Sequence, residues 1–198
     1  RRAFTSQIIM NHILARDGEK IDNVEQALER AKKNGVKELI VQPTHLMQGK
    51  EYDELKETLD KHKADFAKVA LAEPLLGEVG KDAEEVNADK EQVATLLVQA
   101  AVTDGGFDSV QKAGQDGAAF VFLGHGTSHT AAITYSEMQT AMRKLGYNNV
   151  FIGTVEGEPA ETAVDAVIEA VKKAGFKKVT LRPMMVVAGD HAHNDMAG

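Results

Sequence analysis

The chain has 198 residues, of which 43% are hydrophobic, and this length allows one large α/β domain or two lobes of roughly 100 residues each. The net charge of −7 and the lack of a Lys/Arg cluster argue against a nucleic-acid partner, and apolar runs such as AAFVFLG and PMMVVAG are far shorter than the roughly 20 residues of a membrane-spanning helix. The absence of cysteine excludes disulfides, thiolate ligands and cysteine nucleophiles, so any transition-metal site must be built from His, Asp and Glu.

The first half of the chain alternates helical patterns with short apolar runs. Apolar residues with helical spacing predict a helix at 4–14 that Asp17-Gly18 ends, and a second helix that begins at the N-cap Asp22 and stops at Asn34-Gly35. In chain order, the remaining patterns predict a strand at 38–41, a helix at 49–66, an apolar run at 69–71 followed by Pro74, and a helix at 90–103. The charge-rich segment 81–91 (KDAEEVNADKE) is interpreted as a solvated loop or a helix entry.

The second half repeats this alternation more regularly. In chain order, it predicts a strand at 118–123, a helix at 130–145, a strand at 150–153, a helix at 159–174 with Pro159 in its first turn, and a strand at 179–187. Short apolar strands separated by helices are typical of parallel βαβ units, so we expect an α/β fold with helices on both faces of the sheet. The turn-rich stretch 104–117 is the predicted boundary between two lobes.

Polar residues follow each of the three strands predicted in the second half. His125 lies in GHGTSH after the first strand, Glu156 in TVEGE after the second, and His191 in AGDHAHND after the third. Ligands of open parallel sheets bind outside the carboxyl ends of the strands, and glycines there let backbone and ligand approach closely. Two imidazoles and a carboxylate suit cobalt, iron, nickel or zinc, and three protein ligands leave a coordination position open for chemistry. The spacing therefore predicts a metal site of His125, Glu156 and His191.

Other interpretations of these loops stay open. A histidine in a loop is often only solvated or hydrogen-bonded, and a glycine-rich turn before a helix is also compatible with phosphate binding, although this one lacks the lysine of a P-loop. GHGTS does not match the GxSxG pattern of a serine hydrolase. His129 is interpreted as a helix cap or a further contact with the ligand. Weaker candidates for ligand contact, or for orienting His191, are His45, Asp190, His193, Asn194 and Asp195.

Six stretches of this sequence resemble one family of metal chelatases: RRAFTS, IDNVEQALERAKKNGV, VQPTHLMQGKEYDEL, GHGTSH, GTVEGEP and LRPMMVVAGDHAHNDMAG. They are spread along nearly the whole chain and are similar to the anaerobic sirohydrochlorin cobaltochelatases, class II chelatases related in fold to protoporphyrin ferrochelatase. The resemblance implies an α/β fold of two similar chelatase-type lobes, with parallel sheets flanked by helices and a tetrapyrrole cleft between them. The expected lobes are residues 1–115 and residues 116–198, and the second carries the metal site.

The resemblance also implies an activity and a site. Members of this family insert a divalent metal, usually Co2+, into sirohydrochlorin during anaerobic cobalamin biosynthesis, with release of two protons and no use of ATP. The family's metal-binding and catalytic residues match His125, Glu156 and His191 in this sequence. The expected partners are sirohydrochlorin or a related tetrapyrrole and Co2+, with Fe2+, Ni2+ or Zn2+ as alternative metals. No organic cofactor, nucleic acid or membrane partner is expected, and a homo-oligomer is left open.

Three alternatives to a cobaltochelatase remain at this point: a ferro- or nickelochelatase, a zinc hydrolase with the same ligands, and a non-catalytic metal or tetrapyrrole carrier. A hydrolase needs a water-activating base beside the metal, whereas a chelatase needs a wide apolar slot for a planar macrocycle. Because sirohydrochlorin is a polycarboxylate and the chain is acidic, we also expect a local basic rim. The candidates for this rim are Arg1, Arg2, Lys177, Lys178 and Arg182.

The family pattern extends beyond both ends of this sequence. It places a strand and a loop rich in Gly, Thr and Ser before RRAFTS, and a helical region after NDMAG. We therefore expect the N-terminal lobe to lack its first strand and the C-terminal lobe to be truncated. The expected compartment is the cytoplasm, with the periplasm as the alternative.

Overall fold

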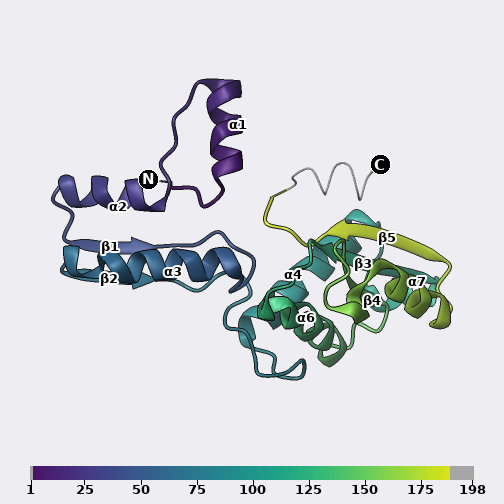
Figure 1. The fold of residues 1–198 in the computed structure, drawn as a ribbon. Coiled ribbons are helices and arrows are strands. Elements are labelled where there is room, and N and C mark those ends of the chain that lie inside the picture. Colours follow the sequence, from purple (N-terminus) through teal and green to yellow (C-terminus); the bar gives the residue numbers. More distant parts are fainter. Residues whose placement is uncertain (1, 188–198) are drawn as a thin grey trace. The chain divides into compact units, whose positions relative to one another are not determined.

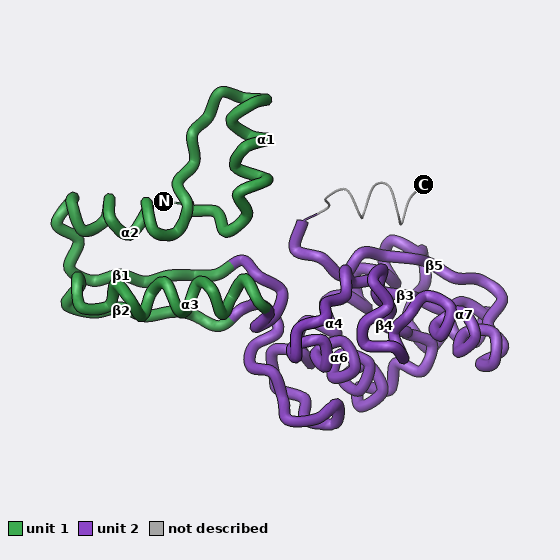
Figure 2. The backbone as a smooth tube through the Cα atoms, viewed as in Figure 1, with its two compact units in different colours: residues 1–43, 50–73 green, residues 44–49, 74–198 purple. Residues whose placement is uncertain are grey.

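The computed structural model describes residues 2–187, and the chain divides into two compact units (Figure 2). The first unit comprises residues 1–43 and 50–73, and the second comprises residues 44–49 and 74–198. Each unit has its own parallel β-sheet (Figure 1). Within residues 2–187, no helix is long and apolar enough to cross a membrane.

The first unit contains a two-stranded parallel sheet. Its elements are α1 (Gln7–Asp17), α2 (Val24–Lys33), β1 (Glu38–Val41), α3 (Lys50–His62), the 3-10 helix η1 (Lys63–Asp65) and β2 (Lys68–Leu71). The two strands pair in register from Glu38 opposite Lys68 to Val41 opposite Leu71. α2 and α3 pack with the sheet around a core whose buried residues are Leu28, Leu55, Leu59 and Phe66.

α2 begins one residue later than predicted. The side chain of Asn23 accepts a hydrogen bond from the backbone N–H of Gln26, and the Gln26 side chain accepts one in return from the backbone N–H of Asn23. This reciprocal capping box makes Asn23 the N-cap, so the predicted N-cap Asp22 is wrong. The carboxylate of Asp22 instead pairs with Arg30 on α2.

The second unit contains a three-stranded sheet with the order β4-β3-β5, and both strand pairs are parallel. Its elements are α4 (Ala88–Asp104), α5 (Val110–Gln115), β3 (Ala118–Gly124), η2 (Thr130–Ala132), α6 (Ile133–Lys144), β4 (Val150–Thr154), η3 (Ala160–Thr162), α7 (Val164–Lys173) and β5 (Lys178–Pro183). The predicted class, an α/β fold with parallel sheets flanked by helices, is confirmed.

β3 lies at the centre of the second sheet and is buried along its whole length. Because successive side chains of a strand point to opposite faces, β3 contributes to two cores. Phe120 and Phe122 belong to the larger core, which includes residues of α4, α5 and α6, whereas Ala119 and Val121 pack with residues of α7. Helices therefore cover both faces of this sheet, as predicted, and Figure 1 shows α6 and α7 on either side of it.

β5 is shorter than predicted, since it ends at Pro183 rather than at residue 187. The residue opposite Pro183 is Leu123, whose carbonyl oxygen also accepts a hydrogen bond from the N–H of Met184 at 2.8 Å. β3 ends one residue later, at Gly124, so the chain beyond Met184 finds no further length of β3 with which to pair.

The predicted helix at 159–174 is divided in two. Pro159 precedes the short 3-10 helix η3, and Ala163 then adopts an extended conformation with ψ of 143°. α7 begins only at Val164, so Pro159 does not lie in its first turn.

The compact units do not divide at the predicted boundary of 115/116. Within the turn-rich stretch 104–117, residues Val110–Gln115 form α5, which contacts both α4 and β3. The division falls near residues 43–50 and 73–74 because α4 and α5 bury their apolar faces in the core of the second sheet. The assignment of residues 1–115 and 116–198 to two chelatase-type lobes remains a prediction.

A buried ion pair connects two helices and a loop of the second unit. Lys90 on α4 and Glu137 on α6 are both 0% exposed, and Lys90 Nζ lies 3.1 Å from Glu137 Oε2. Lys90 Nζ also donates to the carbonyl oxygens of Leu76 and Glu78, and Glu137 Oε1 accepts from the N–H of Gly80. The interpretation of segment 81–91 as solvated is therefore wrong for Lys90, whose ammonium group binds the loop before α4.

Removing one partner of this pair should destabilise the second unit strongly. We expect Lys90→Met to lower the free energy of unfolding by about 3–5 kcal/mol, because it leaves the Glu137 carboxylate buried without its counter-charge. The double variant Lys90→Met/Glu137→Met should recover much of this loss. Urea unfolding followed by circular dichroism measures both. Lys112→Met, which removes one partner of an exposed ion pair with Asp116, is the control and should change stability little. An equal effect of Lys90→Met and Lys112→Met would contradict the prediction.

Candidate metal centre

His125 and Glu156 lie together at the carboxyl edge of the second sheet. β3 ends at Gly124 and β4 at Thr154, and the two loops that follow stay paired through hydrogen bonds from Val155 N–H to Gly124 O and from Glu156 N–H to His125 O, at 3.0 and 2.8 Å. The side chains meet with His125 Nε2 3.9 Å from Glu156 Oε1, and both are about half exposed. Two of the three predicted ligands are therefore neighbours.

The geometry of this pair suits a shared divalent ion. Two ligands of a tetrahedral metal with bonds of 2.0–2.1 Å lie roughly 3.3 Å apart, so a small side-chain rotation would bring the 3.9 Å pair to that separation. His125 Nδ1 lies 2.9 Å from the carbonyl oxygen of Gly126. Because a carbonyl oxygen only accepts, this contact places a ring hydrogen on Nδ1, and Nε2 is the ring nitrogen on the side of Glu156.

The two glycines beside His125 are each required by a close contact. A Cβ atom on Gly124 would lie 2.3 Å from Cε1 of Tyr135, and one on Gly126 would lie 2.9 Å from Cβ of Glu156. Gly126 also has φ of +92°, in the region that side chains rarely adopt. The GHG sequence thus permits His125 to sit between the ring of Tyr135 and the backbone of Glu156.

Tyr135 on α6 supports this turn from the core. Its phenol oxygen accepts the N–H of Gly126 at 3.1 Å. Burial raises the pKa of the Tyr135 phenol, and its interactions with the backbone of Gly126 and His125 oppose the rise. The N–H of Gly126 is therefore directed at Tyr135, which removes one donor from the alternative of a phosphate-binding turn. The sequence signal for Tyr135 was only an aromatic residue at a core position of a helix.

The remaining histidine candidates have different surroundings. His129 Nδ1 accepts the N–H of Ala131 at 3.2 Å, which agrees with its interpretation as a cap. His45 lies on the loop after β1, and its carbonyl oxygen accepts the N–H of Leu75. Within residues 2–187, no group of three His, Asp or Glu side chains forms a metal site.

The third predicted ligand, His191, lies outside the described residues. The same holds for Asp190, His193, Asn194 and Asp195. β5 pairs with β3 on the side opposite to β4, and its carboxyl end at Pro183 lies at the same edge as His125. Ligation by His191 therefore remains a prediction.

Of the candidates for a basic rim that belong to the second unit, Lys177, Lys178 and Arg182, only Arg182 lies at the carboxyl edge of the sheet. Lys178 begins β5 opposite Ala118, at the start of β3, so Lys177 and Lys178 lie at the amino edge, away from His125. Arg182 is near the carboxyl end of β5 and forms an ion pair with Asp104 at 2.7 Å.

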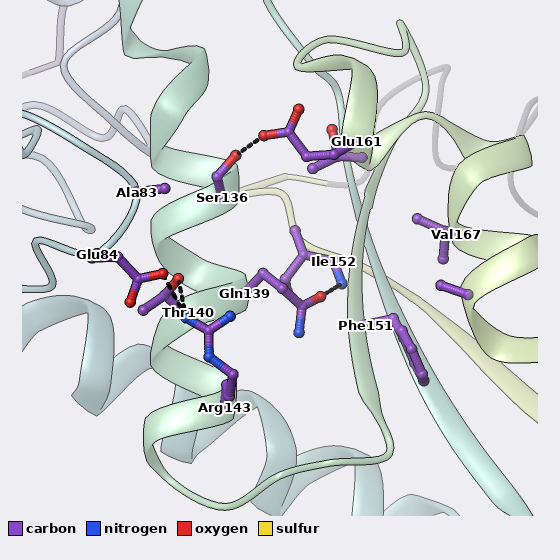
Figure 3. A pocket seen from close by; sticks show the side chains of 12 residues that line it. Ala83, Glu84, Ser136, Gln139, Thr140, Arg143, Phe151, Ile152, Glu161 and Val167 are labelled. Carbon is purple, nitrogen blue, oxygen red and sulfur yellow. Dashed lines mark hydrogen bonds and ion pairs between the residues drawn. The ribbon is translucent and has the colours of Figure 1, made fainter. Parts of the chain in front are cut away.

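A separate cavity of about 400 Å³ borders β4, as Figure 3 shows. Its polar side chains are paired with one another or with the strand. Arg143 binds Glu84, the Ser136 hydroxyl donates to Glu161, and the side-chain amide of Gln139 bonds both the carbonyl of Val150 and the N–H of Ile152. The cavity is lined by neither His125 nor Glu156, so it is not the apolar slot that the resemblance predicts.

Comparison with known proteins gives consistent matches. A family model described as cobalt chelatase (CbiK) matches residues 1–198. The sirohydrochlorin cobaltochelatase of Salmonella typhimurium is 32% identical over 199 residues, which are 99% of this chain and 66% of the relative. The sirohydrochlorin cobaltochelatase CbiKC of Nitratidesulfovibrio vulgaris is 30% identical over 208 residues, 100% of this chain and 63% of the relative. The chain thus spans just under two thirds of the length of these curated relatives.

Replacing Gly126 tests how closely the turn fits Glu156. Gly126→Ala should lower the free energy of unfolding by the roughly 1–2 kcal/mol that a side chain costs at positive φ. It should lower it further because the new Cβ atom displaces Glu156. Gly117→Ala is the matched control, because Gly117 also has positive φ, +76°, but has nothing within 4 Å of an added Cβ. Thermal unfolding should show a larger loss for Gly126→Ala. Equal losses would mean that the contact with Glu156 is relieved at no cost.

Proposed function

Because this chain belongs to the cobalt chelatase family, we propose that it inserts Co2+ into sirohydrochlorin, as a step of anaerobic cobalamin biosynthesis. The observation that carries the proposal is the pair of His125 Nε2 and Glu156 Oε1, 3.9 Å apart at the ends of adjacent parallel strands. Two relatives that match the whole chain bear the name sirohydrochlorin cobaltochelatase, which supports the choice of metal and of tetrapyrrole.

In this proposal, His125 and Glu156 hold the incoming Co2+, and His191 is the third ligand. An imidazole and a carboxylate are suitable donors for a borderline divalent metal, and few protein ligands leave positions for water and then for pyrrole nitrogens. The half-exposed side chains allow the ion to enter from solvent and to lose its bonds again. Since such donors do not select cobalt by raw affinity, Fe2+ and Ni2+ should also be accepted.

The proposed reaction also requires two protons to leave the ring nitrogens. One Co2+ replaces two pyrrole protons, so the charge balances without an electron donor and without ATP. In this proposal His125, Glu156 and His191 bind the metal beside the ring, and imidazole and carboxylate groups can accept these protons and pass them to water. This proton transfer explains why acid–base residues and metal ligands coincide in the proposed site.

The decisive test is an anaerobic absorbance time course of sirohydrochlorin with Co2+, with this chain at far below stoichiometric amounts. Many turnovers per protein would support a chelatase. A spectral change that stops at one equivalent would support a carrier instead. Repeating the assay with Fe2+, Ni2+ and Zn2+ ranks the alternative metals. Insertion of one of these metals without insertion of Co2+ would contradict the assignment to cobalt.

Variants of the three ligands test the site. We expect His125→Ala, Glu156→Gln and His191→Ala each to lower the rate of Co2+ insertion at least ~100-fold, because each removes a donor to the metal. His62→Ala is the control, because His62 ends α3, at the amino-edge side of the first sheet. Its rate should match that of the unchanged chain. Wild-type rates in the His125 and His191 variants would refute the site.

A further inference from the structure

Tyr135 holds the peptide group that follows His125 through one buried oxygen atom. The residue is 2% exposed and lies in the first turn of α6. Its phenol oxygen accepts the N–H of Gly126 at 3.1 Å. That N–H belongs to the peptide group directly after the His125 Cα atom, and the carbonyl oxygen of His125 in the same peptide group accepts the N–H of Glu156 at 2.8 Å. Holding this peptide plane from both sides limits the direction in which the His125 side chain leaves the backbone.

The ring and the hydroxyl of Tyr135 have separate roles in this arrangement. The ring packs against the end of β3 so closely that Gly124 could not carry a Cβ atom. Phenylalanine could supply the same packing, whereas a buried hydroxyl is unfavourable unless it is hydrogen-bonded. The hydroxyl is therefore explained by the N–H of Gly126 in the turn and not by the core.

We infer that the Tyr135 hydroxyl is a positioning group, which holds the His125 imidazole toward Glu156 so that the two side chains bind one metal ion together. The inference rests on the proposed function of His125 and Glu156 as ligands. It assigns no contact between Tyr135 and the metal. Tyr135 acts through the backbone of His125, as the carbonyl of Gly126 acts through its Nδ1 atom.

The variant Tyr135→Phe keeps the ring and removes only the oxygen. Thr134→Val is a matched control, because Thr134 is a neighbouring residue on α6, is 1% exposed, and its hydroxyl has no hydrogen-bond partner within the described part of the chain. Both variants lose one buried hydroxyl, but only the first loses a contact with the His125 turn.

Two measurements report on the turn and on the site. In the metal-free chain, NMR hydrogen exchange at the Gly126 amide should become roughly tenfold faster in Tyr135→Phe, because the acceptor is gone. In a titration with Co2+ alone, the dissociation constant should rise roughly 10-fold or more and the cobalt d–d absorption should change shape, as expected for loss of a group that orients a ligand. Thr134→Val should match the unchanged chain in both.

The results separate this inference from the proposed function. If His125→Ala leaves Co2+ affinity unchanged, the metal centre is wrong and the role of Tyr135 falls with it. If His125→Ala weakens binding while folded Tyr135→Phe binds Co2+ like the unchanged chain, only the role of Tyr135 is overturned. In the His125→Ala background, Tyr135→Phe should cause no further loss of affinity. The inference can also fail without any variant, if the Gly126 amide of the unchanged chain exchanges without protection.

Discussion

The second unit depends on the burial of β3 on both faces and along both edges. Every residue from Ala118 to Gly124 is buried, and the strand pairs with β4 on one side and β5 on the other. Such a strand cannot carry a charged side chain without a buried partner, so polar groups are confined to the points where it begins and ends. His125 is the first residue after it. Parallel pairing with β4 then brings Glu156 to the same edge, which makes the place of the pair a consequence of core burial.

The buried pair of Lys90 and Glu137 extends this organisation to loops that leave the first sheet. Segment 44–49, which follows β1 after two intervening residues, and the chain from residue 74 onward, which follows β2 in the same way, belong to the second unit. There, the N–H of Leu76 donates to the carbonyl of Leu46, and Lys90 binds the carbonyl oxygens of Leu76 and Glu78. One ammonium group thus satisfies loop carbonyls and one carboxylate at the same time. The loops that follow β1 and β2 therefore contribute to the core of the second unit, through Met47 and Leu76.

The sequence predicted what depends on local pattern and missed what depends on distant partners. The strands at 38–41, 118–123 and 150–153 and the neighbouring positions of His125 and Glu156 follow from apolar runs and from the rule for parallel strand ends. The end of β5 could not be predicted from its own apolar pattern, because it is set by the residue at which β3 ends. The burial of Lys90 could not be predicted either. Its partner Glu137 lies 47 positions away in the sequence, and a lysine or a glutamate considered alone is expected at the surface.

The His125–Glu156 pair is held more firmly on one side than on the other. Both side chains are about half exposed, but the His125 ring bonds the carbonyl of Gly126 and the peptide group after His125 bonds Tyr135, whereas the Glu156 carboxylate extends from a backbone fixed at its N–H. A rigid imidazole can define where a metal ion first binds. A carboxylate with more freedom can follow the ion or release it. For a site proposed to pass its metal to a macrocycle rather than keep it, this asymmetry favours transfer, because the Glu156 carboxylate can release the ion without any change in the His125 turn.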